Sequence, residues 1–398
     1  MPVSAAIDTD IRSHIEAWLP EMISLRHHLH RHPELSFQEH DTAALVADRL
    51  TGWGYEVHQG LAGTGVVGTL RLGDGPASVG IRADMDALPI LETTGLDYAS
   101  IHDGRMHACG HDGHTAILLA AARCLAERRR FDGTLRVIFQ PAEEHGGGAR
   151  RMIEDGLFQI LPVDRIFGLH NMPGLPTGVF GFRPGPLTAA NDDIVITIRG
   201  KGGHGAFPDT AIDPILAGAA IVMALQGIVA RNVPAARPAV ITVGSFHAGT
   251  AANVIPDEAV LQLSIRTTDP DTRRLVIRRI HEVAEAQAAS CGASATLEVH
   301  AGYPAVINDP AATAFARDTA GRMFGQARVH DIADAAMGSE DFAFMLEAVS
   351  GCYLVVGNGD GTGPTACMIH NPGYDFNDAI LGDAAALWVG VAEASLQG

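Results

Sequence analysis

Four short segments of the chain carry side chains that bind metal ions or transfer protons. Each follows a stretch that we expect to be a strand of a parallel β-sheet, or lies in the loop beyond one. The carboxyl ends of parallel strands meet at one edge of a sheet, where ligand crevices form. The segments are therefore expected to meet: Met106–Thr115 (MHACGHDGHT), Gln140–Glu144 (QPAEE), Leu169–Asn171 (LHN) and Met368–Pro372 (MIHNP).

These segments offer five groups that can bind a metal ion. A single zinc ion takes three or four protein ligands, so five candidates fit better a pair of ions about 3.5–4 Å apart. One thiolate with three imidazoles favours zinc, nickel or cobalt over magnesium or calcium and leaves manganese open. The candidate ligands are Cys109, His111, Glu144, His170 and His370.

The doublet Glu143-Glu144 suits two tasks at such a site. One carboxylate binds metal, and the other takes a proton from a water molecule whose pKa the metal lowers from about 15.7 to about 7. Taken alone, each of these signals is weak, because a Glu-Glu pair is usually solvated and a single histidine is usually structural. The four histidines in Arg26–Glu34 (RHHLHRHPE) are interpreted as surface or supporting residues.

Composition excludes several classes of function. The 398 residues contain 28 Lys+Arg and 46 Asp+Glu, for a net charge of −18, which disfavours binding to nucleic acid or to anionic membranes. An odd number of cysteines, 5, indicates a reducing compartment. Without a signal-peptide pattern or a run of about 18 apolar residues, we expect a cytoplasmic protein.

The order of expected elements predicts two domains. Strands at 66–70, 78–84, 134–139, 165–170 and 353–356 alternate with helices, among them 8–31, 40–52, 113–130, 310–324, 339–347 and 378–396. This order predicts an α/β domain, residues 1–186 plus 304–398, with a mostly parallel sheet and helices on both faces. Residues 187–303 follow the order strand, helix, strand, strand, helix, strand, which predicts an inserted α+β (ferredoxin-like) domain.

The whole chain resembles a known family, the aminoacylase and hippurate hydrolase branch of the dinuclear metallopeptidases. The family also includes plant auxin-conjugate hydrolases and is related to glutamate carboxypeptidase. The motifs that carry the resemblance run in order from end to end: Ile81–Pro89, Met106–Thr115, Gln140–Glu144, Gly168–Asn171, Gly200–Gly205, Asn253–Pro256, Gly338–Phe342 and His370–Pro372.

The resemblance implies roles for the candidate residues. The five candidate ligands would hold two divalent ions (zinc, manganese, cobalt or nickel), with Cys109 as the bridge. Glu143 would act as the general base and later as the acid. Asp84 would orient a ligand from behind, as residues behind a metal site commonly do. The related peptidases carry His-x-Asp where this chain has Arg82-Ala-Asp84, which weakens a general peptidase assignment.

The resemblance also implies roles for the inserted domain. His204, set among glycines that allow close backbone approach, would polarise the scissile carbonyl in the partner subunit's active site. Asn253 and Arg266 would hold the substrate's carboxylate, and Arg266 lies on the strand face opposite the apolar one. An exposed ion-pairing arginine is the alternative interpretation of Arg266. The domain as a whole would act as a lid and form a homodimer.

Three functional hypotheses follow. The first is a metal-dependent amidohydrolase that cleaves N-acyl or N-aroyl amino acids. The second is an N-carbamoyl-amino-acid hydrolase or a dipeptidase with the same dinuclear site. The third is a non-catalytic protein that binds amino-acid conjugates, which the intact set of Glu143 and five candidate ligands disfavours.

Overall fold

The computed structural model describes residues 4–362 and 367–397 and divides into two compact units. The larger unit comprises Met1–Gly185, Ile307–Ala333 and Asp341–Gly398, and the smaller comprises Pro186–Val306 and Asp334–Glu340. The sequence analysis assigned 334–340 to the catalytic domain. The segment belongs instead to the smaller unit, because the backbone N–H groups of Ala189 and Ala336 donate to Gly338 and Leu187 across it. Residues 1–3, at the start of the stretch expected to lack a signal peptide, lie outside the described residues.

In the part of the chain that is described, the larger unit is built on an eight-stranded sheet in the order β1-β2-β4-β3-β5-β16-β6-β15. The central strands β4, β3, β5 and β16 are parallel, whereas β1, β2 and β4 pair antiparallel at one side. The predicted parallel sheet is therefore confirmed at its centre. The strands are β1 Glu56–Leu61, β2 Gly65–Leu72, β3 Ser78–Asp84, β4 Gly133–Gln140, β5 Arg165–Pro173, β6 Phe180–Phe182, β15 Val329–Asp331 and β16 Gly351–Gly359.

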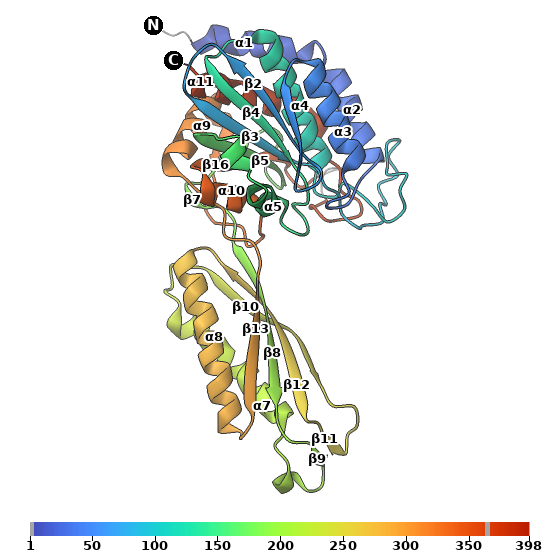
Figure 1. Ribbon diagram of the computed structural model, residues 1–398, viewed down its shortest axis with the longest axis vertical. Helices are drawn as coiled ribbons and strands as arrows, with labels where there is room; N and C mark the ends of the chain where they lie inside the picture. Colours follow the sequence, from blue (N-terminus) through green and yellow to red (C-terminus); the bar gives the residue numbers. More distant parts are fainter. Residues whose placement is uncertain (1–3, 363–366, 398) are drawn as a thin grey trace. The chain divides into compact units, whose positions relative to one another are not determined.

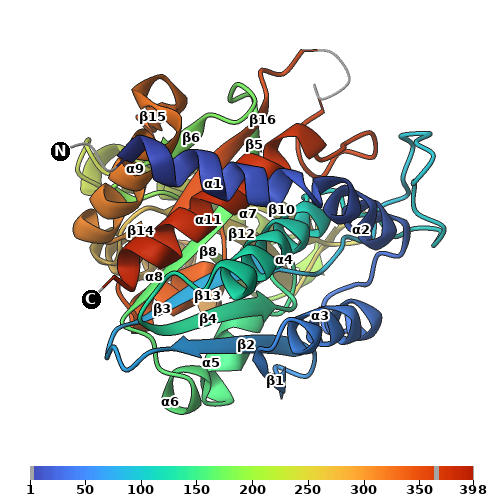
Figure 2. The ribbon, with the colours of Figure 1, turned by 90° about the horizontal axis from the view of Figure 1, so that it is seen from above.

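Helices cover both faces of this sheet (Figures 1 and 2). Helices α4 (His111–Arg128) and α11 (Leu381–Ser395) lie on one face, and α5 (Gly148–Glu154) and α10 (Phe342–Ala348) on the other. The remaining helices of the unit are α1 Ser4–Glu16, α2 Leu19–Arg31, α3 His40–Gly52, α6 Leu157–Ile160 and α9 Pro310–Phe324.

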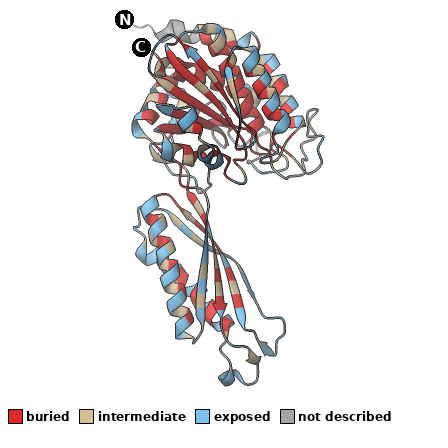
Figure 3. Cartoon of the chain, in the orientation of Figure 1, coloured by how far each residue is buried: buried red, intermediate tan, exposed pale blue. Residues whose placement is uncertain are grey.

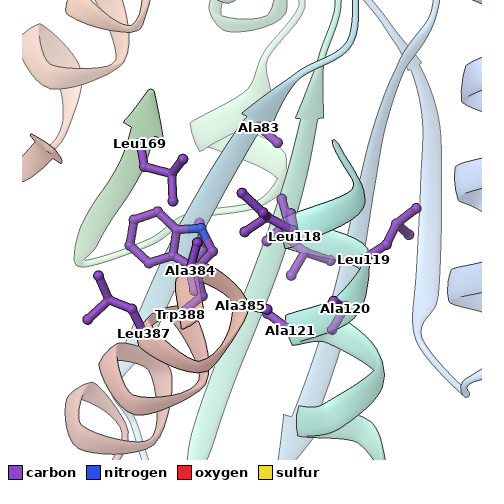
Figure 4. Packing of buried hydrophobic residues seen from close by; sticks show 14 of the residues in the cluster. Ala83, Leu118, Leu119, Ala120, Ala121, Leu169, Ala384, Ala385, Leu387 and Trp388 are labelled. Atoms are coloured by element: carbon purple, nitrogen blue, oxygen red, sulfur yellow. The ribbon is translucent and has the colours of Figure 1, made fainter. Parts of the chain in front are cut away.

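The face covered by α4 and α11 forms the main apolar core. Figure 4 shows Leu118 of α4 and Trp388 of α11 packed near Leu169 of β5, and each of these side chains is at most 2% exposed. Truncating such a leucine to alanine costs about 2–5 kcal/mol. This packing matters for function because it fixes α4, whose first residue is His111.

One predicted helix is divided in two. The sequence analysis expected a single helix over 8–31, but α1 ends at Glu16 and α2 begins at Leu19. Pro20 lies in the first turn of α2. A proline has no N–H to donate and its ring clashes with the carbonyl four residues earlier, so the helix restarts there. Helix α10 also begins later than expected, at Phe342 rather than at residue 339.

The smaller unit has a four-stranded antiparallel sheet in the order β10-β12-β8-β13. The predicted sequence of strands and helices is confirmed: β8 Ala190–Arg199, α7 Pro214–Asn232, β10 Ala239–Ala248, β12 Glu258–Thr267, α8 Pro270–Ser290 and β13 Ser294–Ala301. Buried and accessible residues alternate along β8 and β12 (Figure 3), because one face packs on α7 and α8 and the other does not.

From the sequence we expected no stretch long and apolar enough to span a membrane, and helix α7 departs from that expectation. By length and composition alone it could cross a membrane, and 33% of its most apolar 18-residue stretch is buried. A single helix of this kind is weak evidence, because core helices of other proteins pass the same criterion.

Candidate metal centre

Gly110 sets the geometry of the Cys109–His111 segment. Its φ of +94° turns the chain sharply into α4, and a Cβ there would lie 2.3 Å from the side-chain oxygen of Asn171. Only glycine satisfies both conditions. Cys109 and His111 therefore lie on the two sides of one tight turn at the start of a buried helix.

A second tight turn positions the Glu143-Glu144 doublet. Strand β4 ends at Gln140, and Ala142 has a φ of +54°, which is strained for a residue with a side chain. The turn is held by Glu39, whose buried carboxylate accepts the backbone N–H of Ala142 at 2.9 Å. Such strain persists only where the surroundings fix it and is concentrated at functional sites.

The structure brings the five predicted ligands together. Cys109 Sγ lies 3.2 Å from His170 Nε2, and His370 Nε2 lies 3.2 Å from Glu144 Oε1. Cys109 belongs to two overlapping groups whose ligand atoms all lie within 4.8 Å of one another. A ligand that bridges two ions must lie close to the ligands of both, and Cys109 does. These two groups are Cys109, His111 and His170, and Cys109, Glu144 and His370; a further group without Cys109 consists of His111, Glu143 and Glu144.

The buried imidazole of His111 and the partly buried imidazole of His170 are oriented for metal binding. His111 Nδ1 lies 3.2 Å from Asp86 Oδ1, and its Nε2 is buried with no hydrogen-bond partner in the described residues. His170 Nδ1 donates to the carbonyl of Asn171 at 2.6 Å, which leaves its Nε2 beside Cys109. Metal-binding histidines typically donate their other N–H to a carboxylate or a backbone carbonyl, so these residues fit a metal site.

The electrostatics of the cluster favour a bound cation. Burial raises the pKa of the Cys109 thiol well above its usual value, and the carboxylates of Glu144 and Glu143 raise it further. Burial by itself would lower the pKa of His111, but Asp84 and Asp86 raise it to about 10. Burial lowers the pKa of His170 to about 3, so this imidazole is neutral. A divalent ion would supply the positive charge that the carboxylates favour and would allow the thiol to ionise.

Asp84 and Asp86 have different partners. Asp84 accepts hydrogen bonds from His114 Nδ1 at 2.6 Å and from Arg82 at 2.7 Å, and its oxygen is 3.9 Å from His111 Nε2. The predicted ligand His111 donates its Nδ1–H to Asp86, which the sequence analysis did not select. The signal was available in the same motif, where the second aspartate follows the first by two residues.

Asp341 is a second residue without an assigned role in the sequence analysis, although its motif was noted. Its buried carboxylate accepts hydrogen bonds from the side chain of Gln140 and from the backbone N–H of Ala149, both at 2.8 Å. These bonds tie the start of α5 to the end of β4, directly before the glutamate doublet.

In the smaller unit, His204 and Asn253 are neighbours. Strand β9 (Gly203–His204) pairs with β11 (Val254–Ile255), and the backbone N–H of Gly205 donates to the carbonyl of Asn253 at 2.8 Å. Both side chains are exposed. His204 Nδ1 accepts the backbone N–H of Ala206 at 3.1 Å, so the neutral ring carries its hydrogen on Nε2.

Arg266 does not join that pair. It is half-buried near the end of β12, with Nη1 3.4 Å from Ser339 Oγ. The opposite end of β12, Glu258, pairs with Arg199 at the end of β8 that leads to the His204 loop. Eight residues of strand separate the two ends, which is about 26 Å. One small substrate cannot contact both ends of the same chain's strand.

Residues 80–394 match the family described as Peptidase family M20/M25/M40. The chain belongs to this family. This confirms the resemblance inferred from the sequence, and with it the assignment as a hydrolase.

Individual members of the M20/M25/M40 family are similar over nearly the whole chain. A hippurate hydrolase of Campylobacter jejuni is 41% identical over 372 residues, covering 94% of this chain and 96% of the relative. An N-acetyl-L-cysteine deacetylase of Bacillus subtilis is 43% identical over 363 residues, covering 91% and 85%. Among solved structures, a Bacillus subtilis dinuclear metal-binding peptidase of the M20 family has a TM-score of 0.83 at 37% identity, covering 96% and 99%.

Proposed function

We propose that this protein hydrolyses the amide bond of N-acyl or N-aroyl amino acids with two divalent metal ions. The observation that carries the proposal is the convergence of one thiol, three imidazoles and two glutamates at the turns around Cys109 and Ala142. The names of two relatives support the substrate class, because hippurate and N-acetylcysteine are both amino acids acylated on nitrogen.

The larger unit supplies the ligands and the base. Cys109, His111, Glu144, His170 and His370 would hold the two ions, which, when bound, polarise the carbonyl and lower the pKa of a water molecule. Glu143 is buried, and its Oε2 lies 4.0 Å from His111 Nε2. Its carboxylate takes the proton of the attacking water and passes it to the nitrogen of the leaving amino acid. Asp84 supports the site through His114.

The smaller unit supplies binding groups. His204 presents an Nε2–H that can donate to the substrate's carbonyl oxygen and stabilise developing negative charge. Asn253 and Arg266 bind the substrate's carboxylate, and the guanidinium of Arg266 suits a bidentate contact. Because Arg266 lies far from the His204–Asn253 pair within one chain, we propose that this pair acts from the partner subunit.

The proposed assembly is a homodimer formed through the smaller unit. Helix α7 exposes apolar side chains, including Leu216 at 62% and Met223 at 74%, and β10 is an edge strand that carries the exposed Phe246. Exposed apolar surface beside an unpaired strand edge is typical of a subunit interface. A cytoplasmic location fits the five free cysteines.

A substrate and metal screen tests the proposal. Protein stripped with a chelator is reloaded with zinc, manganese, cobalt or nickel and assayed on N-acetyl, N-benzoyl and N-carbamoyl amino acids and on dipeptides. We expect metal-dependent release of the amino acid from the acyl and aroyl compounds. Preference for carbamoyl compounds or dipeptides would favour the alternative hydrolases, and saturable binding without turnover would favour a binding protein.

The variant Glu143→Gln tests the assigned base. The amide keeps the shape of the side chain but cannot accept the proton, so kcat should fall by about 10²–10⁴-fold. The content of bound metal should stay at the wild-type level. Near-normal turnover of a fully metal-loaded Glu143→Gln enzyme would show that another group is the base.

A further inference from the structure

The four histidines in Arg26–Glu34 form two pairs with different surroundings. His27 and His30 lie against carboxylates of other elements, at 2.7 and 2.9 Å. His28 and His32 lie against each other instead, with their ring centroids 4.7 Å apart. The proposed mechanism uses neither ring of this second pair.

A third imidazole, that of His102, lies beside His32. Their ring centroids are 5.8 Å apart, although His102 belongs to the loop between β3 and α4, which runs beside α2 in Figure 2. Two hydrogen bonds hold this loop to the end of α2: the backbone N–H of Ile101 donates to the carbonyl of Arg31, and the Arg31 side chain donates to the carbonyl of Asp97, both at 3.0 Å. The fold therefore fixes where the third ring lies.

The nitrogens of these three rings are free. In the part of the chain that the structure describes, no hydrogen bond or ion pair involves a ring nitrogen of His28, His32 or His102. By contrast, the exposed His281 and His300 lie 3.3 and 4.0 Å from glutamate oxygens, as expected in a chain with 46 acidic residues. A cluster of imidazoles without acidic partners is suited to share a cation, because the neutral imidazole nitrogen is the commonest metal ligand.

The spacing of His28 and His32 in the sequence is one that binds metal ions on helices. Side chains four residues apart lie on one face of a helix, and the same spacing holds zinc in H-E-x-x-H sites. His28 lies in the last turn of α2, and His32 is the residue directly after the helix. The pair therefore lies on one side of the helix end, in agreement with the short distance between the rings.

The distances between the rings suit one shared ion. Zinc lies about 2.0–2.1 Å from a histidine nitrogen, so two imidazoles on one zinc ion have ring centroids about 4.5–5.2 Å apart. The 4.7 Å between His28 and His32 falls within this range, and the 5.8 Å between His32 and His102 exceeds it by about 0.6 Å. Among the described residues, these three are not a group whose ligand atoms all lie within 4.8 Å of one another. Zinc binding therefore requires a rotation of side chains, which the exposed position of His102 allows.

We propose that His28, His32 and His102 form a zinc-binding site on the surface of the larger unit, separate from the candidate metal centre. Three imidazoles favour zinc, nickel or copper over magnesium and calcium, and a water molecule would complete a tetrahedral zinc ion. The bound ion would link the end of α2 to the loop that leads to the Cys109–His111 segment. This site goes beyond the proposed hydrolysis and does not depend on it.

The test counts the zinc ions bound by the wild type and by the variants His28→Asn and His102→Asn. Each variant replaces an exposed side chain, so it should fold like the wild type, and asparagine is not among the usual zinc ligands. At a zinc concentration that saturates the wild type, equilibrium dialysis with metal analysis should find one ion per chain fewer in each variant. The control His330→Asn, at an exposed position of the same unit, should bind as many ions as the wild type. Wild-type zinc content in either His28→Asn or His102→Asn would overturn the inference, and so would the same loss in the control.

A crystal structure of the zinc-loaded wild type gives a second readout that needs no variant. An anomalous difference map at the zinc absorption edge should show an ion about 2.0–2.1 Å from a nitrogen of each of the three histidines. An ion held by fewer than three of them, or no ion there, would overturn the inference. Neither measurement uses substrate, so failure of the proposed amide hydrolysis would be seen separately.

Discussion

Around Cys109 in the larger unit the candidate functional side chains are mostly buried and hydrogen-bonded, whereas His204 and Asn253 in the smaller unit are exposed on a short two-stranded loop. The buried carboxylates of Asp86 and Glu39 in the larger unit are each held by several hydrogen-bond donors. His204 has a single backbone hydrogen bond to its ring among the described residues.

This contrast suits the two units to different tasks. Buried carboxylates with several hydrogen-bond donors hold a rigid geometry around the metal ligands and the general base, which both require. Exposed groups on a glycine-containing loop adapt to a substrate and contribute little to folding. Variants of the predicted metal ligands in the larger unit should therefore change metal content, and variants of His204 in the smaller unit should change kinetics alone.

The largest expected effect is that of Cys109→Ala. Loss of the shared ligand should reduce bound metal below two ions per subunit and abolish activity, as measured by metal analysis and amide hydrolysis. The control Cys124→Ala removes a buried thiol from the core of α4 and should retain the metal. Two tightly bound ions in Cys109→Ala would contradict the bridging role of Cys109. They would also contradict the idea that the larger unit holds the metal site.

His204→Ala should lower kcat by about 10²–10³-fold, the usual cost of losing one oxyanion donor, while metal content and melting temperature stay unchanged. The exposed His247 of the same unit provides the control, His247→Ala. A change in metal content on removal of His204 would show that the two units do not divide the tasks in this way.

Mixing inactive subunits tests whether His204 acts across a dimer. After exchange, subunits carrying His204→Ala and subunits carrying Glu143→Gln form hybrids with one intact site. Random pairing should restore about a quarter of wild-type activity. No recovery after verified exchange would mean that His204 acts on its own chain's site.

Arg266→Lys should have a smaller effect, confined to substrate binding. A lysine keeps the charge but cannot make the two parallel hydrogen bonds of a guanidinium, so KM should rise by about 10-fold while kcat stays similar. Arg199→Lys, at an exposed position on β8, serves as the control and should not change KM. An equal fall in kcat would indicate a role in the chemical step.

The smallest expected effect concerns stability and pH. Burial raises the pKa of Glu39 to about 7, whereas an unfolded glutamate titrates near about 4.3. Between these values the folded state holds a proton that the unfolded state has lost, so this group's contribution to the free energy of unfolding decreases as pH rises, by up to about 3 kcal/mol.

Glu39→Gln should remove that slope. The amide oxygen can still accept the backbone N–H groups of Ala142 and Phe37, and the hydroxyl of Thr64 can turn to accept from the amide NH₂. Urea unfolding from pH 5 to 8 should show the variant gaining stability relative to wild type as pH rises. The exposed Glu298 gives the control Glu298→Gln, for which the difference should stay constant.

The sequence predicted the elements and the ligand cluster because both depend on local patterns. Alternating strands and helices define the parallel sheet, and the carboxyl ends of its strands carry Cys109, Glu144 and His170. The sequence did not separate the roles of Asp84 and Asp86. Both lie within two residues of the end of β3, and their roles depend on which donors the turn at Ala142 brings close.

Other features depended on pairing between distant segments. The segment 334–340 looked like part of the α/β domain because it precedes α10, and only its hydrogen bonds with residues 187–189 assign it to the smaller unit. The distance between Arg266 and the His204 loop likewise follows from the antiparallel register of β8 and β12, which no single motif reveals.

The first and last strands of the smaller unit, β8 and β13, are antiparallel neighbours, with Asp192 opposite Ala301. Once this unit has folded, the chain re-emerges beside the point at which it left. Folding of the smaller unit has then already brought the ends of this long insertion together, so its loop-closure entropy no longer opposes the pairing of β16 with β5. Fast folding of the insertion would in this way speed completion of the sheet that surrounds it.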